Sequence, residues 1–413
     1  MSVQAQYRTE EYNIFDLGAP HAKWKQMREE KPVFQDPESG YWIITRHADI
    51  KAVFDDWKTF SSENAQAPMR PMCDAGKQIM KDGGFTVYSG LSARVPPDHT
   101  RIRKLAQSAF GPRRFKAIQP QIEAIIDRHL TKIAAAGACD FFREVAYDVP
   151  ALVLFALMGI PDADVPKVKD WAASRALLTW GNLSDEDQLP LAHKMVEYWS
   201  YCRALVAARK ESPGDDFPTD MVRAQAEGGD ITDEEIAGLM YSVLFAGHET
   251  TTTLMSNAVI TLMLNRDAWK AICVDPGLIP AATEELLRFE PSIVSWRRKA
   301  KTDAEIGGIA IPEGADILLV MGSGNRDAAV FENPENFDIE RQNARNHLSF
   351  GYGIHFCIGF QLAKMELGIM LRELTARFPN MTLKPDQEID YLHNISFRVP
   401  NQVMVDLGLE KTQ

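Results

Sequence analysis

The feature that most constrains the fold is one long, mostly apolar segment without proline, TDEEIAGLMYSVLFAGHETTTTLMSNAVITLML at residues 232–264. Thr232 and Glu235 form the Ser/Thr-x-x-Glu pattern of a capping box, which predicts a helix start at this point. A helix of roughly 30 residues is about 45 Å long at 1.5 Å per residue, enough to cross a whole domain. We therefore expect a central helix whose middle is buried.

The rest of the chain also reads as mostly helical. Amphipathic runs occur around residues 100–135, 150–160 and 190–210. Strand-like segments are GYWIITR at 40–46, the C-terminal stretch 393–407, and 304–322, a β-hairpin pattern with Pro312 and Gly314 at its turn. Repeats, low-complexity tracts and Gly/Ser linkers are absent from the sequence, so we expect one domain over residues 1–413, mainly α with a smaller β region.

Charge and composition exclude several function classes. A net charge of −12 argues against nucleic acid as a partner, because a phosphate backbone demands a basic face. The polar N-terminus is no secretory signal, and the longest uninterrupted apolar run, ALVLFALMGI, is shorter than the roughly 20 residues that span a bilayer. We expect a cytoplasmic protein with no membrane contact. The five cysteines form no CxxC pair, which argues against a disulfide framework or a zinc cage.

One cysteine stands in unusual surroundings, the stretch HLSFGYGIHFCIGF at residues 347–360. Glycines precede and follow Cys357, and the apolar helix expected next would aim its free N–H groups at the sulfur. Such donors lower the pKa of a thiol and stabilise a thiolate, which acts as a nucleophile or a metal ligand. A nucleophile would need a base and an oxyanion hole, and only His355 is close in sequence. The alternative is a small core cysteine in a glycine turn.

The pattern FGYGIHFCIG matches Phe-Gly-x-Gly-x-His/Arg-x-Cys-x-Gly and resembles the heme-binding loop of the cytochrome P-450 family. The resemblance implies the fold of that family, with heme b between the long central helix and the cysteine loop. It implies that Cys357 is the axial ligand of the heme iron, because a cysteine thiolate holds the iron in this family. Further heme contacts implied by the resemblance are Phe350, Gly351, His355 and Ala246.

A polar patch, AGHETT at 246–251, interrupts the long apolar helix. On a structural reading, the hydroxyls bond to carbonyls one turn earlier, while Glu249 reaches solvent or a basic partner. By resemblance, Glu249 and Thr250 are the family's acid–alcohol pair, in which Thr250 holds a water and the dioxygen and Glu249 relays protons. Small residues beside them would leave room for O₂ and substrate.

The segment EELLR contains Glu285 and Arg288, which face each other on one helix. Taken alone, this is an ordinary surface pair. The later segment FENPENFDIER, 331–341, resembles the family's meander, which implies a buried network that shapes the cysteine loop. The arginine expected before Phe337 is Asn336 here, and Arg341 is the candidate replacement.

Basic residues have two expected roles. A buried heme needs its propionates neutralised, and the resemblance implies four partners: His99, Arg103, Arg298 and His355. A locally basic cluster also stands out in an acidic chain, and it is either a solvated face or, by resemblance, a docking face for an acidic redox partner. Its members are Arg101, Arg103, Lys104, Arg113, Arg114 and Lys116.

The resemblance implies a monooxygenase that inserts one atom of O₂ into a C–H bond of a small apolar aromatic or terpenoid substrate, by hydroxylation or O-dealkylation. No flavin or iron–sulfur domain follows, so electrons are expected from a separate ferredoxin-type protein. SIVSWRRKAKTD is similar to the bacterial subgroup that includes self-sufficient fusion members and aryl-ether dealkylating enzymes.

Two alternative functions remain open. One is a non-enzymatic heme-thiolate gas sensor or ligand carrier, and the other is a peroxide-driven peroxygenase, which usually lacks the acid–alcohol pair. The expected substrate contacts are Phe85, Val87, Phe245, Ala246, Ile293, Val294 and Phe397.

Overall fold

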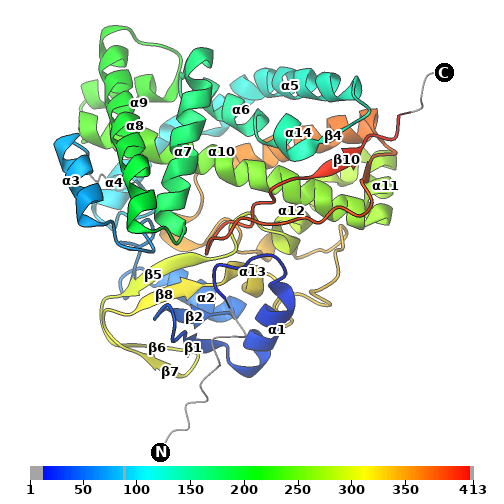
Figure 1. Ribbon diagram of the computed structural model, residues 1–413, viewed down its shortest axis with the longest axis horizontal. Coiled ribbons are helices and arrows are strands. Elements are labelled where there is room, and N and C mark those ends of the chain that lie inside the picture. The colour runs from blue at the N-terminus through cyan, green and yellow to red at the C-terminus, as the bar shows by residue number, and fades with distance from the viewer. Residues whose placement is uncertain (1–12, 87–89, 410–413) are drawn as a thin grey trace, which may run out of the picture.

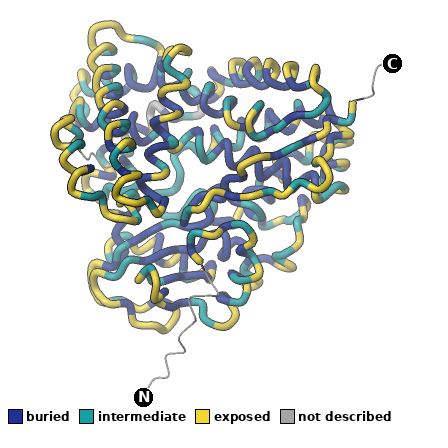
Figure 2. The backbone as a smooth tube through the Cα atoms, in the orientation of Figure 1, coloured by how far each residue is buried: buried dark blue, intermediate teal, exposed yellow. Residues whose placement is uncertain are grey.

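The computed structural model describes residues 13–86 and 90–409, and its centre is the long helix α10 (Asp233–Leu264) (Figure 1). The predicted capping box is present: the Thr232 hydroxyl accepts from the amide of Glu235, and the Glu235 carboxylate accepts from the amide of Thr232. From Leu254 to Met263 every residue of α10 is buried, and Figure 2 shows the dark core around this helix. The expectation of a buried central helix is confirmed.

Helices surround α10 on several sides, and α6, α7, α8, α9, α12 and α14 contact it. The amphipathic runs predicted from sequence are helical in the structure, because each buries its apolar stripe against this shared core. The helices of this layer are α3 (Asp74–Asp82), α4 (Asp98–Ala109), α5 (Pro112–Ala134), α6 (Val149–Leu157), α7 (Val165–Trp180), α8 (Asp185–Glu211), α9 (Phe217–Ala226), α11 (Arg266–Val274), α12 (Ile279–Phe289) and α14 (Phe360–Arg377).

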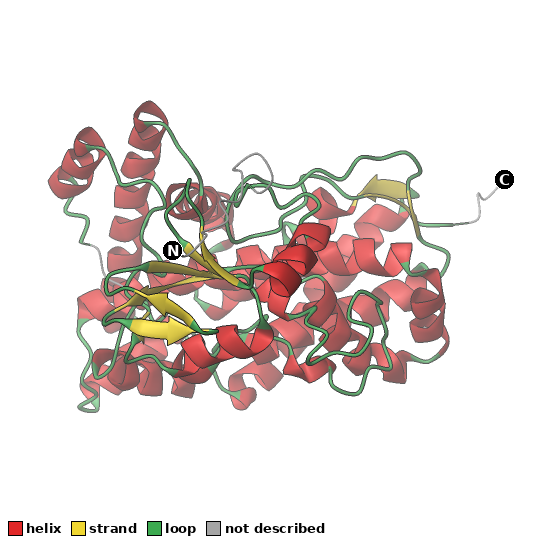
Figure 3. Cartoon of the chain, turned by 90° about the horizontal axis from the view of Figure 1, so that it is seen from below, coloured by secondary structure: helices red, strands yellow, loops and turns green. Residues whose placement is uncertain are grey.

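The β region lies mainly at one side of the helical layer (Figures 1 and 3). Its five-stranded sheet has the order β1-β2-β8-β5-β3, in which β2 and β8 are parallel and the other neighbours are antiparallel. The strands are β1 (Val33–Gln35), β2 (Trp42–Ile44), β3 (Phe60–Ser61), β5 (Trp296–Ala300) and β8 (Asp316–Leu319). Short helices pack beside this sheet: α1 (His21–Glu30), α2 (His47–Asp55) and α13 (Met321–Gly324).

The predicted hairpin over 304–322 is wrong in its turn. The paired strands are β6 (Ala304–Ile306) and β7 (Ile309–Ile311), joined at Gly307 and Gly308, which both have positive φ. Two successive positive-φ residues suit a two-residue hairpin turn, and glycine adopts them without strain. The segment around Pro312 and Gly314 instead leads into β8, which pairs with β2 and β5.

The C-terminal stretch contributes less strand than its pattern suggested. Within 393–407 the strand is β10 (Met404–Asp406), which pairs with β4 (Ala138–Asp140) and β9 (Thr382–Leu383), while Phe397 forms an isolated bridge to Ile293. The predicted class, mainly α with a smaller β region, is confirmed. Among the described residues, no helix combines the length and apolar character that crossing a bilayer requires.

Candidate active site

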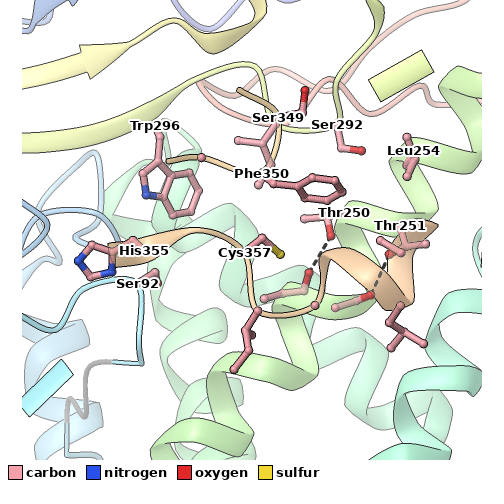
Figure 4. Close-up of a pocket in the computed structure, with 18 of the residues that line it drawn as sticks. Ser92, Thr250, Thr251, Leu254, Ser292, Trp296, Ser349, Phe350, His355 and Cys357 are labelled. Atoms are coloured by element: carbon pink, nitrogen blue, oxygen red, sulfur yellow. Dashed lines mark hydrogen bonds between the residues drawn. The ribbon is translucent and has the colours of Figure 1, made fainter. Parts of the chain in front are cut away.

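A cavity lies between α10 and the loop that carries Cys357, and side chains from distant parts of the chain line it (Figure 4). Cys357 and Thr250 are both lining residues, so the sulfur loop and the polar patch of α10 meet across one space. The predicted site residues that line this cavity are Ala246, Thr250, Ile293, Arg298, Phe350, Gly351, His355 and Cys357.

The cysteine loop is shaped by its glycines. Gly351 and Gly353 have φ of 70° and 69°, and a Cβ on Gly353 would lie 2.8 Å from the carbonyl oxygen of Phe54. Glycine is required at both positions, because side chains disfavour this conformation. The amide of Cys357 donates to the carbonyl of Phe350 at 2.9 Å, which closes the loop just before α14 begins.

The environment of the Cys357 thiol differs from the sequence expectation in its net effect. The backbone N–H groups of Gly359 and Phe360 lower its pKa as expected, and so does the charge of Arg103. Burial outweighs these donors and raises the pKa of the thiol above its ordinary value. A positive metal ion at the sulfur would reverse this balance, because a coordinating thiol is deprotonated outright.

Basic groups gather at one edge of the cavity, and several of their buried nitrogens lack a hydrogen-bond partner in the described part of the chain. The rings of His99 and His355 lie with centroids 4.2 Å apart. Among described residues, both ring nitrogens of His99, Nδ1 of His355 and Nε of Arg298 have no hydrogen-bond partner. Burial is the largest cause that lowers the pKa of His99 to about 4, of His355 to about 3 and of Arg298 to about 9.

Unpaired buried donors of this kind cost free energy unless an anion accepts from them. Arg103 completes the group, since its guanidinium donates to the carbonyl of Phe356 at 2.6 Å in the cysteine loop. A thiol on one wall and these donors at one edge fit a flat cofactor that carries carboxylates and a thiolate-bound metal. The residues present thus suit heme.

The polar patch of α10 adopts the back-bonded arrangement. Thr250 donates to the carbonyl of Ala246 at 2.8 Å, Thr251 to that of Gly247 at 3.1 Å, and Thr253 to that of Glu249 at 2.9 Å. The structural reading of these hydroxyls is therefore confirmed. Thr250 and Thr251 nevertheless line the cavity, so both are also placed to contact a bound molecule.

Glu249 points elsewhere. Its carboxylate lies 3.1 Å from Nε2 of the buried His248 and keeps part of its surface exposed, and it is not among the residues that line the cavity. It stands next to Thr250 in sequence and has an exposed side, which is the placement that a carrier of protons from solvent would need.

Sequence reasoning missed Glu366 on α14. This side chain lines the cavity, is 1% exposed, and its Oε2 has no partner among described residues. Burial raises the pKa of this carboxyl well above its ordinary value, which favours the neutral, proton-carrying form. The spacing Leu362, Glu366, Met370 puts a carboxyl in an apolar stripe, and that pattern was the available signal.

Glu285, Arg288 and Arg341 form a buried network behind the cysteine loop. Arg288 binds both carboxylate oxygens of Glu285, and Arg341 Nε lies 3.2 Å from the same carboxylate. Asn336 contributes its carbonyl, which accepts from both arginines. Arg341 does replace the expected arginine, and the surface-pair reading is wrong.

The predicted substrate contacts fall into three groups. Ala246 and Ile293 line the cavity. Phe245 and Phe397 pack edge to face beside it, and both contact Trp180. Neither Phe85 nor Val294 is among the lining residues. Phe85 packs on Trp199 and Tyr241. Val294 packs in the core, because side chains alternate along this extended segment and its neighbour Ile293 faces the cavity. Val87 lies outside the described residues.

The predicted basic cluster is smaller than its sequence suggests. Arg101 pairs with Glu235 at 2.7 Å, and Arg114 pairs with Asp215 and Asp220. Lys104, Arg113 and Lys116 are exposed and make no ion pair in the described part of the chain. Arg103 is partly buried and donates to the carbonyl of Phe356 in the cysteine loop, so the exposed free charge of this face comes from Lys104, Arg113 and Lys116.

Comparison with known proteins places the chain among relatives of one kind. Residues 277–404 match the family model described as Cytochrome P450. The chain is 34% identical over 370 residues, 88% of either chain, to the erythromycin C-12 hydroxylase of Saccharopolyspora erythraea. Among solved structures it resembles cytochrome P450 CREJ in complex with (4-ethylphenyl) dihydrogen phosphate, with 53% identity, a TM-score of 0.93, and 96% and 98% of the two chains covered.

A third similar protein is an intact type IV self-sufficient cytochrome P450 monooxygenase, with 34% identity and a TM-score of 0.91. The match covers 96% of this chain and 52% of that one. This similarity agrees with the predicted likeness to self-sufficient fusion members, and the predicted fold is confirmed by both structures.

Proposed function

The chain belongs to the cytochrome P450 family and is a monooxygenase of that family, and on that premise we propose that it oxidises a C–H bond of a small aromatic substrate. The observation that carries this proposal is the placement of Cys357 across one cavity from Thr250. A metal-binding sulfur and a hydroxyl that faces it are the two parts that thiolate-supported oxygen chemistry needs.

Members of the family use a heme-iron cofactor, and we propose heme b as its form here, with residues 1–413 as one heme domain. Cys357 would hold the iron, while His99, Arg103, Arg298 and His355 would bind the propionates. The unpartnered nitrogens at that edge support this assignment, because two carboxylates would satisfy them. Phe350 and Gly351 of the loop and Ala246 of α10 line the same cavity and would contact the macrocycle.

Heme held by a cysteine thiolate supplies O₂ activation and favours O–O cleavage. The protein would supply protons and exclude water. The Thr250 hydroxyl at the cavity can hold a water or accept and pass a proton, and Glu249 can exchange protons with solvent through its exposed side. Glu366 lines the same cavity and its pKa is raised by burial, so it would serve as a second proton donor.

The aromatic residues beside the cavity support an aromatic substrate. Trp180 stacks on Phe245 at 5.2 Å and meets Phe397 edge to face at 4.8 Å, and Trp296 lines the cavity. Such rings favour a flat apolar ligand. The similar protein CREJ binds (4-ethylphenyl) dihydrogen phosphate, so we propose that alkylphenyl groups, free or as phosphate esters, are the substrates.

Electrons would come from a separate ferredoxin-type protein. Lys104, Arg113 and Lys116 are exposed on α4 and α5, and Arg103 of α4 reaches the cysteine loop through Phe356. An acidic partner on this face would dock close to Cys357, guided by complementary charge.

The test is an optical and turnover experiment on the purified holoprotein. The dithionite-reduced protein with carbon monoxide should show the strongly red-shifted band of thiolate ligation, and Cys357→His should abolish it. With ferredoxin, its reductase, NADH and ¹⁸O₂, 4-ethylphenyl substrates should yield products that carry one labelled oxygen. Unlabelled product, or product formed only with added peroxide, would contradict the proposal.

A further inference from the structure

Arg175 on α7 is a buried cation without a buried anion. Arg175 is 4% exposed, and it makes no ion pair in the described part of the chain. Its guanidinium donates to the carbonyl of Tyr241 and to the Gln66 side chain, both at 2.7 Å. A buried charge with only neutral partners is destabilising, and an anionic ligand would offset this loss of stability.

The surroundings of Arg175 lead to the active-site cavity. The amide oxygen of Gln66 accepts from Arg175, and its amide nitrogen donates to the hydroxyl of Ser92, which lines the cavity. The guanidinium also lies 5.3 Å from the ring centroid of Phe245, the residue before the lining residue Ala246. Arg175 is therefore one amide side chain away from the space where a substrate would bind.

An unpartnered hydroxyl completes this group. Ser242 Oγ is buried and has no hydrogen-bond partner among described residues. It lies one helical turn before Ala246 on α10, and a Cβ placed on Gly90 would be 2.1 Å from this oxygen and 3.9 Å from Gln66 Oε1. Ser242, Gln66 and the backbone near Ser92 are therefore close neighbours.

We propose that Arg175, with Gln66, Ser92 and Ser242, forms a binding site for the dianionic head group of a phosphate monoester substrate. An arginine and hydroxyl donors suit phosphate oxygens, and Arg binds phosphate with two parallel hydrogen bonds. Phosphate at this site would leave the aromatic ring beside Phe245 and its alkyl group toward the cavity between Thr250 and Cys357. The inference rests on the proposed function and names the group that selects its substrate.

A second buried arginine offers a matched control. Arg297 also lacks a carboxylate partner in the described part, but it donates to the carbonyl of Ala65 and contacts Met69. Strand alternation places it on the face of β5 opposite to Trp296 and Arg298, which line the cavity. Arg297 should therefore have no part in binding the head group.

The test compares two probes that differ only in the phosphate, 4-ethylphenyl dihydrogen phosphate and 4-ethylphenol, by titration of the ferric holoprotein. The parent should bind the phosphate ester more tightly. Arg175→Gln should weaken binding of the ester by about 10- to 100-fold and change 4-ethylphenol binding by less than about threefold, because hydrogen bonds to charged groups are lost only for the ester. Arg297→Gln should leave the ratio of the two affinities unchanged.

Two further variants address the risk that Arg175→Gln does not fold. Ser242→Ala removes an unpartnered hydroxyl and should weaken only the ester, by severalfold. Ser242→Asp places a carboxylate beside Arg175 and should exclude the ester while 4-ethylphenol still binds. Equal affinity of the parent for both probes, no binding of either, or equal losses for both in these variants would overturn the proposal.

Turnover separates this inference from the proposed function. If 4-ethylphenol is oxidised as well as its phosphate ester, the head-group site is wrong and the monooxygenase proposal stands. If the ester binds selectively through Arg175 but neither probe is oxidised, the site stands and the proposed substrate chemistry fails.

Discussion

Arg288 donates two hydrogen bonds of 2.7 Å to the carboxylate of Glu285, and neither side chain has exposed surface. Arg341 reaches the same carboxylate, and Arg288 also donates to the carbonyls of Asn325, Pro334 and Asn336. These carbonyls belong to the segment that leads into the cysteine loop. The network joins α12 to that segment and so supports the wall of the cavity that carries Cys357.

Removing one member of this network should therefore lower the stability of the fold. Arg288→Ala leaves the Glu285 carboxylate buried with two of its four hydrogen bonds, so we expect the free energy of unfolding to fall by about 3–5 kcal/mol, with loss of heme. Denaturant titration of the holoprotein, followed by absorbance and circular dichroism, measures both effects. Arg223→Ala is the control, because Arg223 is largely exposed and lies 3.9 Å from Asp220; it should cost less than about 1 kcal/mol. Similar losses in both variants would contradict the role of the network.

The sequence predicted features that depend on local chemistry. The capping box of α10 involves residues three apart, and the apolar period of its core face follows from helix geometry alone. The cysteine loop was predicted from a motif whose glycines have the positive φ that the loop requires. The spacing of Glu285 and Arg288 predicted only that they face each other, and their part in a buried network came from the resemblance of 331–341 to the family's meander.

What the sequence did not predict depends on distant contacts. The hairpin turn was misplaced because Pro312–Gly314 looks like a turn locally, while β8 finds its partners in β2 and β5. Glu366 was overlooked since a single carboxylate in an amphipathic helix is usually at its surface. Arg175 gave no signal at all: its burial arises only when α7 packs against α8 and α10.

Thr250 and Thr253 make the same back-bond, but only Thr250 lines the cavity. If Thr250 handles protons in the reaction, Thr250→Ala should release hydrogen peroxide and lower the product formed per NADH by at least about tenfold, because a positioned proton donor contributes about 10²–10⁴-fold. Thr253→Ala removes an equivalent helix hydroxyl away from the cavity and should keep the parent coupling. Peroxide and product quantified together against NADH consumption give the coupling. Unchanged coupling in Thr250→Ala would exclude Thr250 from the proton path.

Glu366 should make the protein less stable as pH rises. Burial raises its pKa above the ordinary value of 4.5, so the folded protein keeps a proton that the unfolded chain has lost. The stabilisation from this proton is complete below about pH 4.5 and is lost progressively as pH rises toward the folded pKa, by up to about 1.4 kcal/mol per pH unit.

Glu366→Gln carries no titrating group and should remove this slope, so the variant gains stability relative to the parent between about pH 5 and 8. Unfolding free energies of the two holoproteins across that range measure the difference, and Glu340→Gln, at an exposed position, is the control. Parallel stability curves for parent and Glu366→Gln would show that the carboxyl is not held protonated.

The basic face that the structure shows is smaller than the cluster predicted from sequence, so it predicts which charges guide a ferredoxin. Lys104, Arg113 and Lys116 are exposed and without ion pairs in the described ranges, whereas Arg101 and Arg114 are already neutralised by carboxylates. Charge reversal at Lys104 or Arg113 should therefore slow the second-order reduction of the heme by an acidic ferredoxin about tenfold at low salt and much less at high salt, because rim charges act mainly on the association rate. Stopped-flow reduction at two ionic strengths measures this rate.

The control is Lys301→Glu, which reverses a charge on the sheet side, where Lys301 pairs with Glu63, and should leave the reduction rate unchanged. If all three variants are slowed alike, the effect comes from net charge, and the ferredoxin does not dock on this face.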